Sequence, residues 1–287
     1  MPSDPVVLRY SAFTEDPAGG NPAGVVLDAA GLDDAAMQAI AADVGYSETA
    51  FVTASDRDGD LHVRYFSPEA EVPFCGHATI AAAVAWGDAH GFGALRLHTA
   101  AGLVAVDVTP GAGDGPPVAP LTSVAPRSLP VAAADLAEAL TALGWDATEL
   151  DPSLPPRAAF AGAWHLVLAT ATPERLADLD YDFERLRTLM AARDWTTLAL
   201  VHRTGPATFR ARNPFPPGGV VEDPATGAAA AALGGYLREL GLVEPPARVT
   251  ISQGEDMGRP SLLAVEVPEG AESGIRVSGA AVPIPAS

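Results

Sequence analysis

The sequence contains no lysine: all 17 basic residues are arginine, against 36 aspartates and glutamates, so the formal net charge is −19. This absence excludes enzymes that form a lysine Schiff base, and it excludes the phosphate-binding lysine of a P-loop. The acidic excess also argues against nucleic acid or an anionic membrane as a partner, because neutralising phosphates requires a basic surface. The charge predicts a well-solvated surface.

Cysteine is nearly absent as well. Cys75 is the only one, which excludes an intramolecular disulfide framework and a cluster of thiolates around zinc. The histidines other than His77 have no metal-ligand spacing, and the sequence predicts no metal site. These five residues are His62, His90, His98, His165 and His202.

Long hydrophobic runs are missing too. The longest, Ile80 to Trp86, is far shorter than a membrane span. The first residues, Met1 to Asp4, lack the basic and apolar regions of a signal peptide, so we expect a soluble, cytoplasmic protein. Hydrophobic residues make up 48% of the 287 positions, enough for a sizeable core in one large domain or two ordinary ones.

Two stretches of the chain follow the same order of elements. In each, a strand leads into a proline-containing loop, then an Ala-rich helix, a glycine stop and a pair of strands. The first stretch has strands at 6–11, 24–27, 50–53 and 61–66, helices at 33–44 and 77–86 ended by Gly87, and a strand pair at 95–99 and 103–108. The second has helices at 133–143, 183–192 and 225–240, strands at 163–169, 197–202 and 207–212, and a strand pair at 248–253 and 262–267.

The repeated order predicts a duplicated α+β protein. Residues 109–130 are rich in Pro and Gly without periodicity, which is typical of a linker. We therefore expect an N-terminal domain at 1–115 and a C-terminal domain at 116–287 that includes the linker at its start.

The two Ala-rich helices begin at comparable places, Cys75–Thr79 and Asp223–Gly227. Because neither helix has a polar face, we expect each to be buried in its own domain. The first amide groups of a helix have no partner within it, and with the helix dipole they form a site for an anion such as a carboxylate. Gly76 and Gly227 would let a ligand approach the backbone closely. Two such helix starts that meet in one cleft would suit a small carboxylate.

Several motifs carry a family resemblance. They are Gly20-Asn21-Pro22-Ala23-Gly24-Val25-Val26, Ser47-Glu48-Thr49-Ala50-Phe51-Val52, Phe74-Cys75-Gly76-His77-Ala78-Thr79, Glu222-Asp223-Pro224-Ala225-Thr226-Gly227, and Ser252-Gln253-Gly254 with Gly258-Arg259-Pro260-Ser261. Together they span nearly the whole chain and resemble the phenazine-biosynthesis isomerase-like family, relatives of diaminopimelate epimerase.

The resemblance implies an α+β fold of two similar epimerase-like domains. Each would be a mostly antiparallel sheet around a central Ala-rich helix, with the active site in the cleft between the domains. It further implies a homodimer without a cofactor, and a reaction like the isomerisation of trans-2,3-dihydro-3-hydroxyanthranilate, in which a proton moves along a conjugated ring.

The resemblance also assigns residues. The family's acid/base glutamate falls on Glu48, and its substrate-binding residues fall on His77 and Asp223. The amides around Gly76 and Gly227 would hold the carboxylate. Thr226 belongs with the substrate-binding residues, and Cys75 and Asn21 are secondary candidates.

Each of these assignments has a structural alternative. A glutamate at the start of a strand is most often simply solvated, which is the alternative for Glu48. His77 could be a helix cap, and Asp223 could be the N-cap of the second Ala-rich helix. Cys75 could be an inert, buried thiol.

Cys75 also bears on the type of reaction. The epimerase relatives use two thiols on opposite faces of a stereocentre, whereas the second helix start here has Asp223-Pro224 and no thiol. The two-thiol mechanism is therefore excluded within this chain. Another departure from the family is Ala228, where members often have a serine.

The sequence therefore predicts a cofactor-independent isomerase that moves a proton within a small carboxylate, with Glu48 as general acid/base. The alternatives are an amino-acid epimerase or racemase, and a non-catalytic small-molecule-binding protein with the same fold. The expected partners are the small carboxylate substrate and a second copy of the chain.

Overall fold

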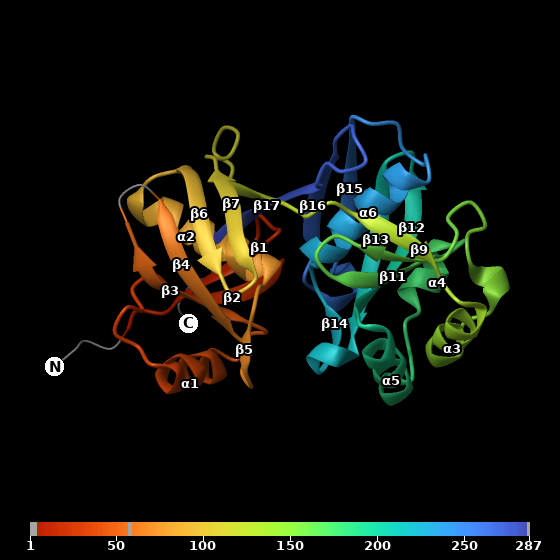
Figure 1. Ribbon diagram of the computed structural model, residues 1–287, viewed down its shortest axis with the longest axis horizontal. Helices are drawn as coiled ribbons and strands as arrows, with labels where there is room; N and C mark the ends of the chain where they lie inside the picture. Colours follow the sequence, from red (N-terminus) through yellow and green to blue (C-terminus); the bar gives the residue numbers. More distant parts are fainter. Residues whose placement is uncertain (1–4, 57–58, 286–287) are drawn as a thin grey trace. The chain divides into compact units, whose positions relative to one another are not determined.

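The structure, a computed structural model, describes residues 5–56 and 59–285 (Figure 1). These residues form two compact units. Unit 1 takes in the chain up to Thr122 together with the segment from Ser278 onward, and unit 2 is Ser123–Val277. Both are mixed α/β structures.

Most of unit 1 is β-sheet with two helices. Its elements are β1 (Leu8–Ala12), β2 (Asn21–Val26), α1 (Asp34–Val44), β3 (Thr49–Ser55), β4 (Asp60–Phe66), β5 (Glu71–Val72), α2 (Gly76–His90), β6 (Gly93–Thr99), β7 (Gly102–Val108), β8 (Val118–Thr122) and, from the far end of the chain, β17 (Arg276–Pro283).

The strands of unit 1 close into a barrel. The pairings run in the order β1, β2, β3, β4, β6, β7, β8 and β17, and β17 pairs with β1 to complete the ring. The β2–β3 and β4–β6 pairs are parallel. Closure leaves the ring without a free edge, because every strand in it has two neighbours.

Helix α2 packs inside this ring, against β1, β2, β3, β7 and β8. Its residues from His77 to Gly87 are all buried, and most of them are small. A helix without a polar face fits such an interior because alanines allow the surrounding strands to approach closely. Helix α1 lies on the outside, where Met37 and Ala41 pack on Val26, Phe51 and Phe66.

Unit 2 contains the remaining elements. They are β9 (Arg127–Pro130), α3 (Ala133–Leu143), β10 (Arg157–Phe160), β11 (Trp164–Ala169), α4 (Pro173–Ala177), α5 (Phe183–Arg193), β12 (Trp195–Gly205), β13 (Thr208–Phe215), β14 (Val220–Asp223), α6 (Gly227–Glu239), β15 (Ala247–Gln253) and β16 (Ser261–Val267), with short 3-10 turns at Ala147–Glu149, Pro216–Gly218 and Glu255–Met257.

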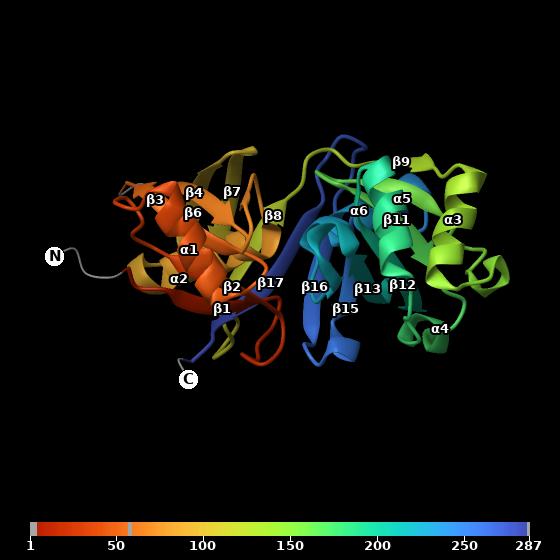
Figure 2. The same ribbon diagram turned by 90° about the horizontal axis from the view of Figure 1, so that it is seen from below.

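The strands of unit 2 pair in the same sense as those of unit 1. An antiparallel pair β10–β11 is followed by a parallel step to β12, an antiparallel step to β13, a parallel step to β15 and an antiparallel step to β16. Helix α6 occupies the same place in the order as α2. Helices α3 and α5 lie side by side (Figure 2) and enclose leucines of β11 and β12 in a second core.

The structure departs from the expected elements in several places. Helix α2 continues through Gly87 to His90, with Gly91 as its C-cap; an added Cβ on Gly87 would lie 2.6 Å from the Phe92 ring, so this glycine serves close packing rather than stopping the helix. The expected linker at 109–130 contains β8 and β9. The segment from Ser278 onward belongs to unit 1 rather than to the C-terminal unit, because β17 pairs with β1.

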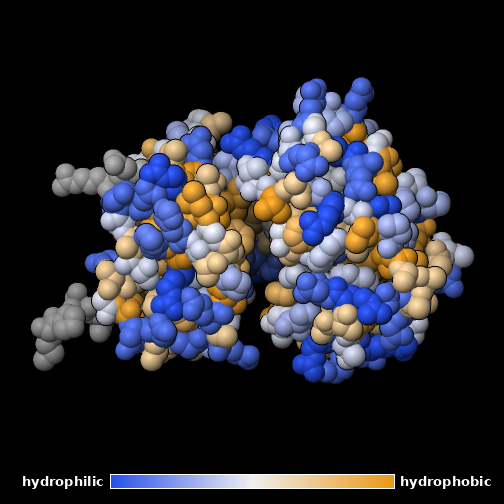
Figure 3. All heavy atoms as spheres, viewed as in Figure 1, coloured by the Kyte–Doolittle hydropathy of each residue, from blue (hydrophilic) through white to orange (hydrophobic). Residues whose placement is uncertain are grey.

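The surface agrees with the acidic composition. Hydrophilic residues cover much of the visible face of both units, with hydrophobic residues scattered among them (Figure 3). No helix in the described part of the chain has both the length and the apolar content needed to cross a bilayer.

One ionisable group lies deep in unit 2. His165 on β11 is fully buried, and its Nδ1 lies 2.8 Å from Thr197 Oγ1, which also accepts a hydrogen bond from Asn213 Nδ2 at 3.0 Å. Its Nε2 has no hydrogen-bond partner among the described residues. Burial lowers the pKa of His165 from 6.5 to about 3. The imidazole is therefore neutral in the folded protein over most of the pH range.

We predict that His165 makes the protein sensitive to acid. Below pH 6.5 the His165 imidazole binds a proton in the unfolded chain but not in the folded one. Between pH 6.5 and 3 this difference lowers the unfolding free energy by up to about 1.4 kcal/mol for each pH unit. A His165→Leu variant leaves Thr197 bonded to Asn213 and should have a flatter profile. Urea unfolding of both proteins from pH 7 to 4 measures the difference, and parallel profiles would contradict the prediction.

Candidate functional site

Glu48 is held by the parallel pairing of β2 and β3. It directly precedes β3, and its backbone carbonyl accepts a hydrogen bond from the Gly24 amide at 3.2 Å. Gly24 allows this close approach, because an added Cβ would lie 2.6 Å from Thr49 Oγ1. The Glu48 side chain is 16% exposed. Its carboxylate is thus mostly shielded, on a backbone that the sheet holds in place.

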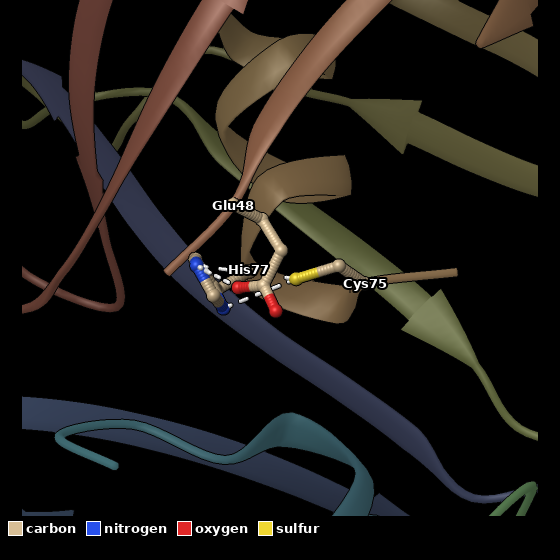
Figure 4. Close-up of side chains that lie close together, drawn as sticks. All are labelled: Glu48, Cys75 and His77. Carbon is tan, nitrogen blue, oxygen red and sulfur yellow. Dashed lines mark hydrogen bonds and ion pairs between the residues drawn. The ribbon is translucent and has the colours of Figure 1, made fainter. Parts of the chain in front are cut away.

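Three chemically active side chains meet at this point (Figure 4). Glu48 Oε2 lies 3.4 Å from His77 Nε2, and Cys75 Sγ lies 3.3 Å from His77 Nδ1. We call these three residues the thiol–imidazole–carboxyl cluster. Ser47 Oγ adds a further polar contact, 3.3 Å from His77 Nε2. A carboxylate beside an imidazole and a thiol can accept, hold and return a proton.

The cluster lies at the start of α2. Cys75 is the N-cap residue, and its side chain makes no capping hydrogen bond to the helix. An added Cβ on Gly76 would meet only Leu121, at 4.0 Å, among the described residues, so Gly76 is not required by close packing. The helix start therefore keeps the amides and the positive dipole end that attract an anion.

Side chains of Thr79 and Tyr65 hold the backbone at Cys75 in place. Thr79 Oγ1 donates a hydrogen bond to the Cys75 carbonyl at 2.6 Å, and the Tyr65 hydroxyl lies 2.7 Å from Thr79 Oγ1. Burial raises the pKa of Tyr65, so its hydroxyl stays protonated and remains available as a donor. This chain of contacts fixes the first turn of α2 beneath the cluster.

The second Ala-rich helix also has an ordered start. Asp223 ends β14, and its carboxylate accepts a hydrogen bond from Thr226 Oγ1, the hydroxyl of the N-cap residue of α6. Gln253 on β15 connects the two residues. It accepts from the Thr226 amide at 3.1 Å and donates to the Asp223 carbonyl at 2.7 Å. This local network fixes the orientation of the Asp223 carboxylate.

We predict that the buried Gln253 amide holds this loop together. A Gln253→Met variant keeps the length of the side chain but removes three hydrogen bonds, to Thr226 and to the Asp223 carbonyl, and should lower the unfolding free energy by about 1–3 kcal/mol. The matched control is Gln38→Met, which removes one half-buried bond to the Ser67 carbonyl. Denaturant unfolding compares the two, and an equal loss in both would contradict the role of Gln253.

An ion pair supports the same loop. Arg212 on β13 donates to both carboxylate oxygens of Glu222, which precedes Asp223, at 3.0 and 2.6 Å. The side chains of Arg212 and Glu222 are only 12% and 4% exposed. Arg212 also donates to the Ala177 carbonyl at 2.7 Å. The strand that ends at Asp223 is therefore anchored by a buried charge pair.

The structure brings some of the predicted site residues together within each unit. In unit 1 these are Glu48, Cys75 and His77, with Gly76 beside them; in unit 2 they are Asp223, Thr226 and Gly227. Asn21 is buried at the start of β2. Neither capping alternative holds: Cys75 rather than His77 is the N-cap of α2, and Thr226 rather than Asp223 is the N-cap of α6.

Three further residues have roles that sequence reasoning missed. Ser47 and Gln253 lie in the family motifs, which imply no function for them, and Arg212 lies outside those motifs. Arg212 sits on a strand two residues before a Pro-rich loop that contains an acidic pair, but only the fold reveals which of the two acids it contacts.

Comparisons with known proteins find similarity along nearly the whole chain. The phenazine biosynthesis-like protein family matches residues 10–286. A trans-2,3-dihydro-3-hydroxyanthranilate isomerase from Pseudomonas fluorescens is 33% identical over 267 residues, which cover 93% of this chain and 91% of that protein.

Solved structures share the fold. A phenazine biosynthesis protein of the PhzF family from Bacillus anthracis superposes with a TM-score of 0.87 at 26% identity, over 97% of this chain and 96% of that one. A predicted epimerase from Pseudomonas aeruginosa gives a TM-score of 0.85 at 28% identity, over 98% of both chains. With a family match across nearly its whole length, this chain belongs to the phenazine biosynthesis-like family.

Proposed function

We propose that this protein is an isomerase that moves a proton within a small carboxylate-bearing substrate, with Glu48 as general acid/base. The observation that carries the proposal is the shielded Glu48 carboxylate, 3.4 Å from His77 Nε2 in the first turn of a buried helix. The Pseudomonas fluorescens relative, named as an isomerase, supports the reaction class.

In this proposal Glu48 takes a proton from an acidified carbon and returns it to another carbon on the same face. The electron pair left behind moves through the conjugated system, and no group leaves the substrate. His77 lies next to Glu48 and can orient the substrate by a hydrogen bond. The amides at Gly76 and His77 would stabilise the substrate carboxylate and the negative charge that develops during transfer.

The proposed substrate-binding residues include Asp223, Thr226 and Gly227 in unit 2. This part follows the family pattern, in which an aspartate and the amides of a second helix start bind the substrate. The network around Gln253 supports it, because a carboxylate held in one orientation suits recognition of an amine or hydroxyl.

We further propose the architecture that the family resemblance implies: two similar epimerase-like domains, each with a central Ala-rich helix. The repeated order and sense of strand pairing in the two units supports a duplication. A homodimer that works without a cofactor is part of the same proposal.

Cys75 favours a second candidate reaction, the epimerisation or racemisation of an amino-acid derivative. Its sulfur lies 3.3 Å from His77 Nδ1, so a thiol and a carboxyl belong to the same cluster. In that reaction one group would remove the proton and the other would return it on the opposite face of a stereocentre.

A solvent-exchange experiment tests these proposals. The protein is incubated in D₂O with a panel of small carboxylates that includes cyclic dihydroxy- and amino-acids, and deuterium incorporation is followed by NMR. Double-bond migration would support the isomerase, and exchange at a stereocentre with loss of optical rotation would support the epimerase. Ligand-induced thermal stabilisation without any exchange would overturn both and favour a non-catalytic binding protein.

A further inference from the structure

The thiol–imidazole–carboxyl cluster offers one ligand atom from each of three residue types that bind transition metals. Cys75 Sγ, a ring nitrogen of His77 and a carboxylate oxygen of Glu48 all lie within 4.8 Å of one another. The sequence predicted no metal site because Glu48 is remote from Cys75 in the chain. The β2–β3 pairing and the start of α2 bring the three together.

The separations fit a tetrahedral ion. Ideal zinc bond lengths place neighbouring nitrogen and oxygen ligands about 3.4 Å apart, and sulfur and nitrogen ligands about 3.6 Å apart. The observed distances are 3.4 Å between His77 Nε2 and Glu48 Oε2, and 3.9 Å between Cys75 Sγ and the same nitrogen. The His77–Glu48 separation already matches a shared ion. Cys75 Sγ lies nearer His77 Nδ1, at 3.3 Å, and within 4.8 Å of the Glu48 carboxylate, so metal binding requires the Cys75 side chain to rotate toward Nε2.

The ligand types also define which ions would bind. A thiolate and an imidazole favour Zn²⁺ and Co²⁺ over Mg²⁺ and Ca²⁺, which prefer oxygen ligands. Three protein ligands leave a fourth position for water or an anion. The net charge of −19 would concentrate cations around the protein.

We propose that Cys75, His77 and Glu48 form a site for a zinc-class transition-metal ion, and that the bound ion inhibits the protein. On binding, the Cys75 thiol gives up its proton to solvent, and the metal replaces the Ser47 contact at His77 Nε2. The inhibition rests on the proposed function, since a Glu48 carboxylate bound to a metal can no longer accept a proton from a carbon atom.

Cobalt titration of the full chain, kept reduced, tests the site directly. Because Cys75 is the only cysteine, a thiolate-to-cobalt charge-transfer band in the near ultraviolet can come from this residue alone. We expect a band that saturates at one Co²⁺ per chain, disappears when one equivalent of Zn²⁺ is added, and is unaffected by Mg²⁺. No saturable band in the wild-type chain would overturn the proposal.

Variants separate a three-residue site from a thiol that binds metal alone. Cys75→Ser should abolish the band. Glu48→Gln and His77→Ala should each weaken Co²⁺ binding by at least the roughly 10- to 100-fold typical of losing an outer-shell partner. His98→Gln, on an exposed histidine paired with Asp60, is the matched control and should bind Co²⁺ like the wild type. Unchanged affinity in both Glu48→Gln and His77→Ala would overturn the proposal.

The inhibition is read out separately, from the solvent-exchange rate with and without Zn²⁺, each variant being compared with its own metal-free rate. A saturable cobalt band without any exchange activity would leave the metal site standing and contradict the proposed function. Exchange activity without a cobalt band would support the proposed function and overturn the metal site. Exchange that continues at full rate in a protein saturated with Zn²⁺ would overturn the inhibition.

Discussion

Replacing Glu48 with glutamine is expected to reduce turnover by at least about 10²- to 10⁴-fold, the contribution typical of a positioned general acid/base. Glutamine has nearly the same shape as glutamate but cannot take up a proton from carbon. The fold should persist, because the position of Glu48 depends on the Gly24 amide bonding to its backbone carbonyl rather than on its carboxylate.

Solvent-deuterium exchange into the substrate found in the panel measures this loss, and thermal unfolding checks that the variant is folded. Glu69→Gln is the matched control, since Glu69 is an exposed glutamate of the same unit. Near wild-type exchange by Glu48→Gln would show that another group is the base. Cys75 would then be the next candidate, because it lies in the same cluster.

The second large effect is expected on stability, from the buried Arg212–Glu222 pair. Arg212→Met removes the cation but leaves the Glu222 carboxylate, which is only 4% exposed, without its counter-charge. Breaking a buried pair from one side costs about 3–5 kcal/mol, because an uncompensated charge stays in a poorly solvated place. We expect a loss of this size in the free energy of unfolding.

Two comparisons make this prediction specific. Arg248→Met breaks the exposed Arg248–Glu266 pair and should cost no more than about 1 kcal/mol. A double variant, Arg212→Met with Glu222→Met, should regain much of the stability lost by the single one, because no charge is left buried. Urea unfolding measures all three, and a loss below about 1 kcal/mol in Arg212→Met would contradict the prediction.

Much of the local structure could be predicted from the sequence, because its signals are local. Alternating apolar residues gave the hairpin of β6 and β7 and the pair of β15 and β16, both antiparallel in the structure. The run of alanines after Cys75 gave a buried helix, since a segment without a polar face has no side to present to water.

Other features depend on distant contacts and could not be predicted in this way. The strand β17 closes the ring by pairing with β1, and its Gly279 makes room for Phe13, which adopts a positive φ of 64°. The expected linker became β8 for the same reason, since β17 supplies its partner. β8 has no alternating pattern of its own, and in β17 the buried positions include Gly279 and Ala281, residue types that are uncommon in strands.

The residues of the candidate site could be predicted from the sequence, but the contacts between them could not. The family motifs contained Glu48, Cys75 and His77, but the distances that make them one cluster arise from the pairing of β2 with β3 and the placement of α2. The contacts of Gln253 with Asp223 and Thr226 likewise join residues about thirty positions apart. A sequence names such residues without stating which of them touch.

The pairing of β1 with β17 has a consequence for how a newly made chain acquires its shape. Tyr10 lies opposite Pro283, so synthesis must pass Pro283 before β1 can meet β17. Unit 2, by contrast, is one continuous segment, Ser123–Val277. Unit 2 can fold while β1 still has an unpaired edge. Loop-closure entropy slows the pairing of β1 with β17, because the two strands lie far apart in the sequence. The N-terminal strands therefore keep an unpaired edge after all of unit 2 has been synthesised.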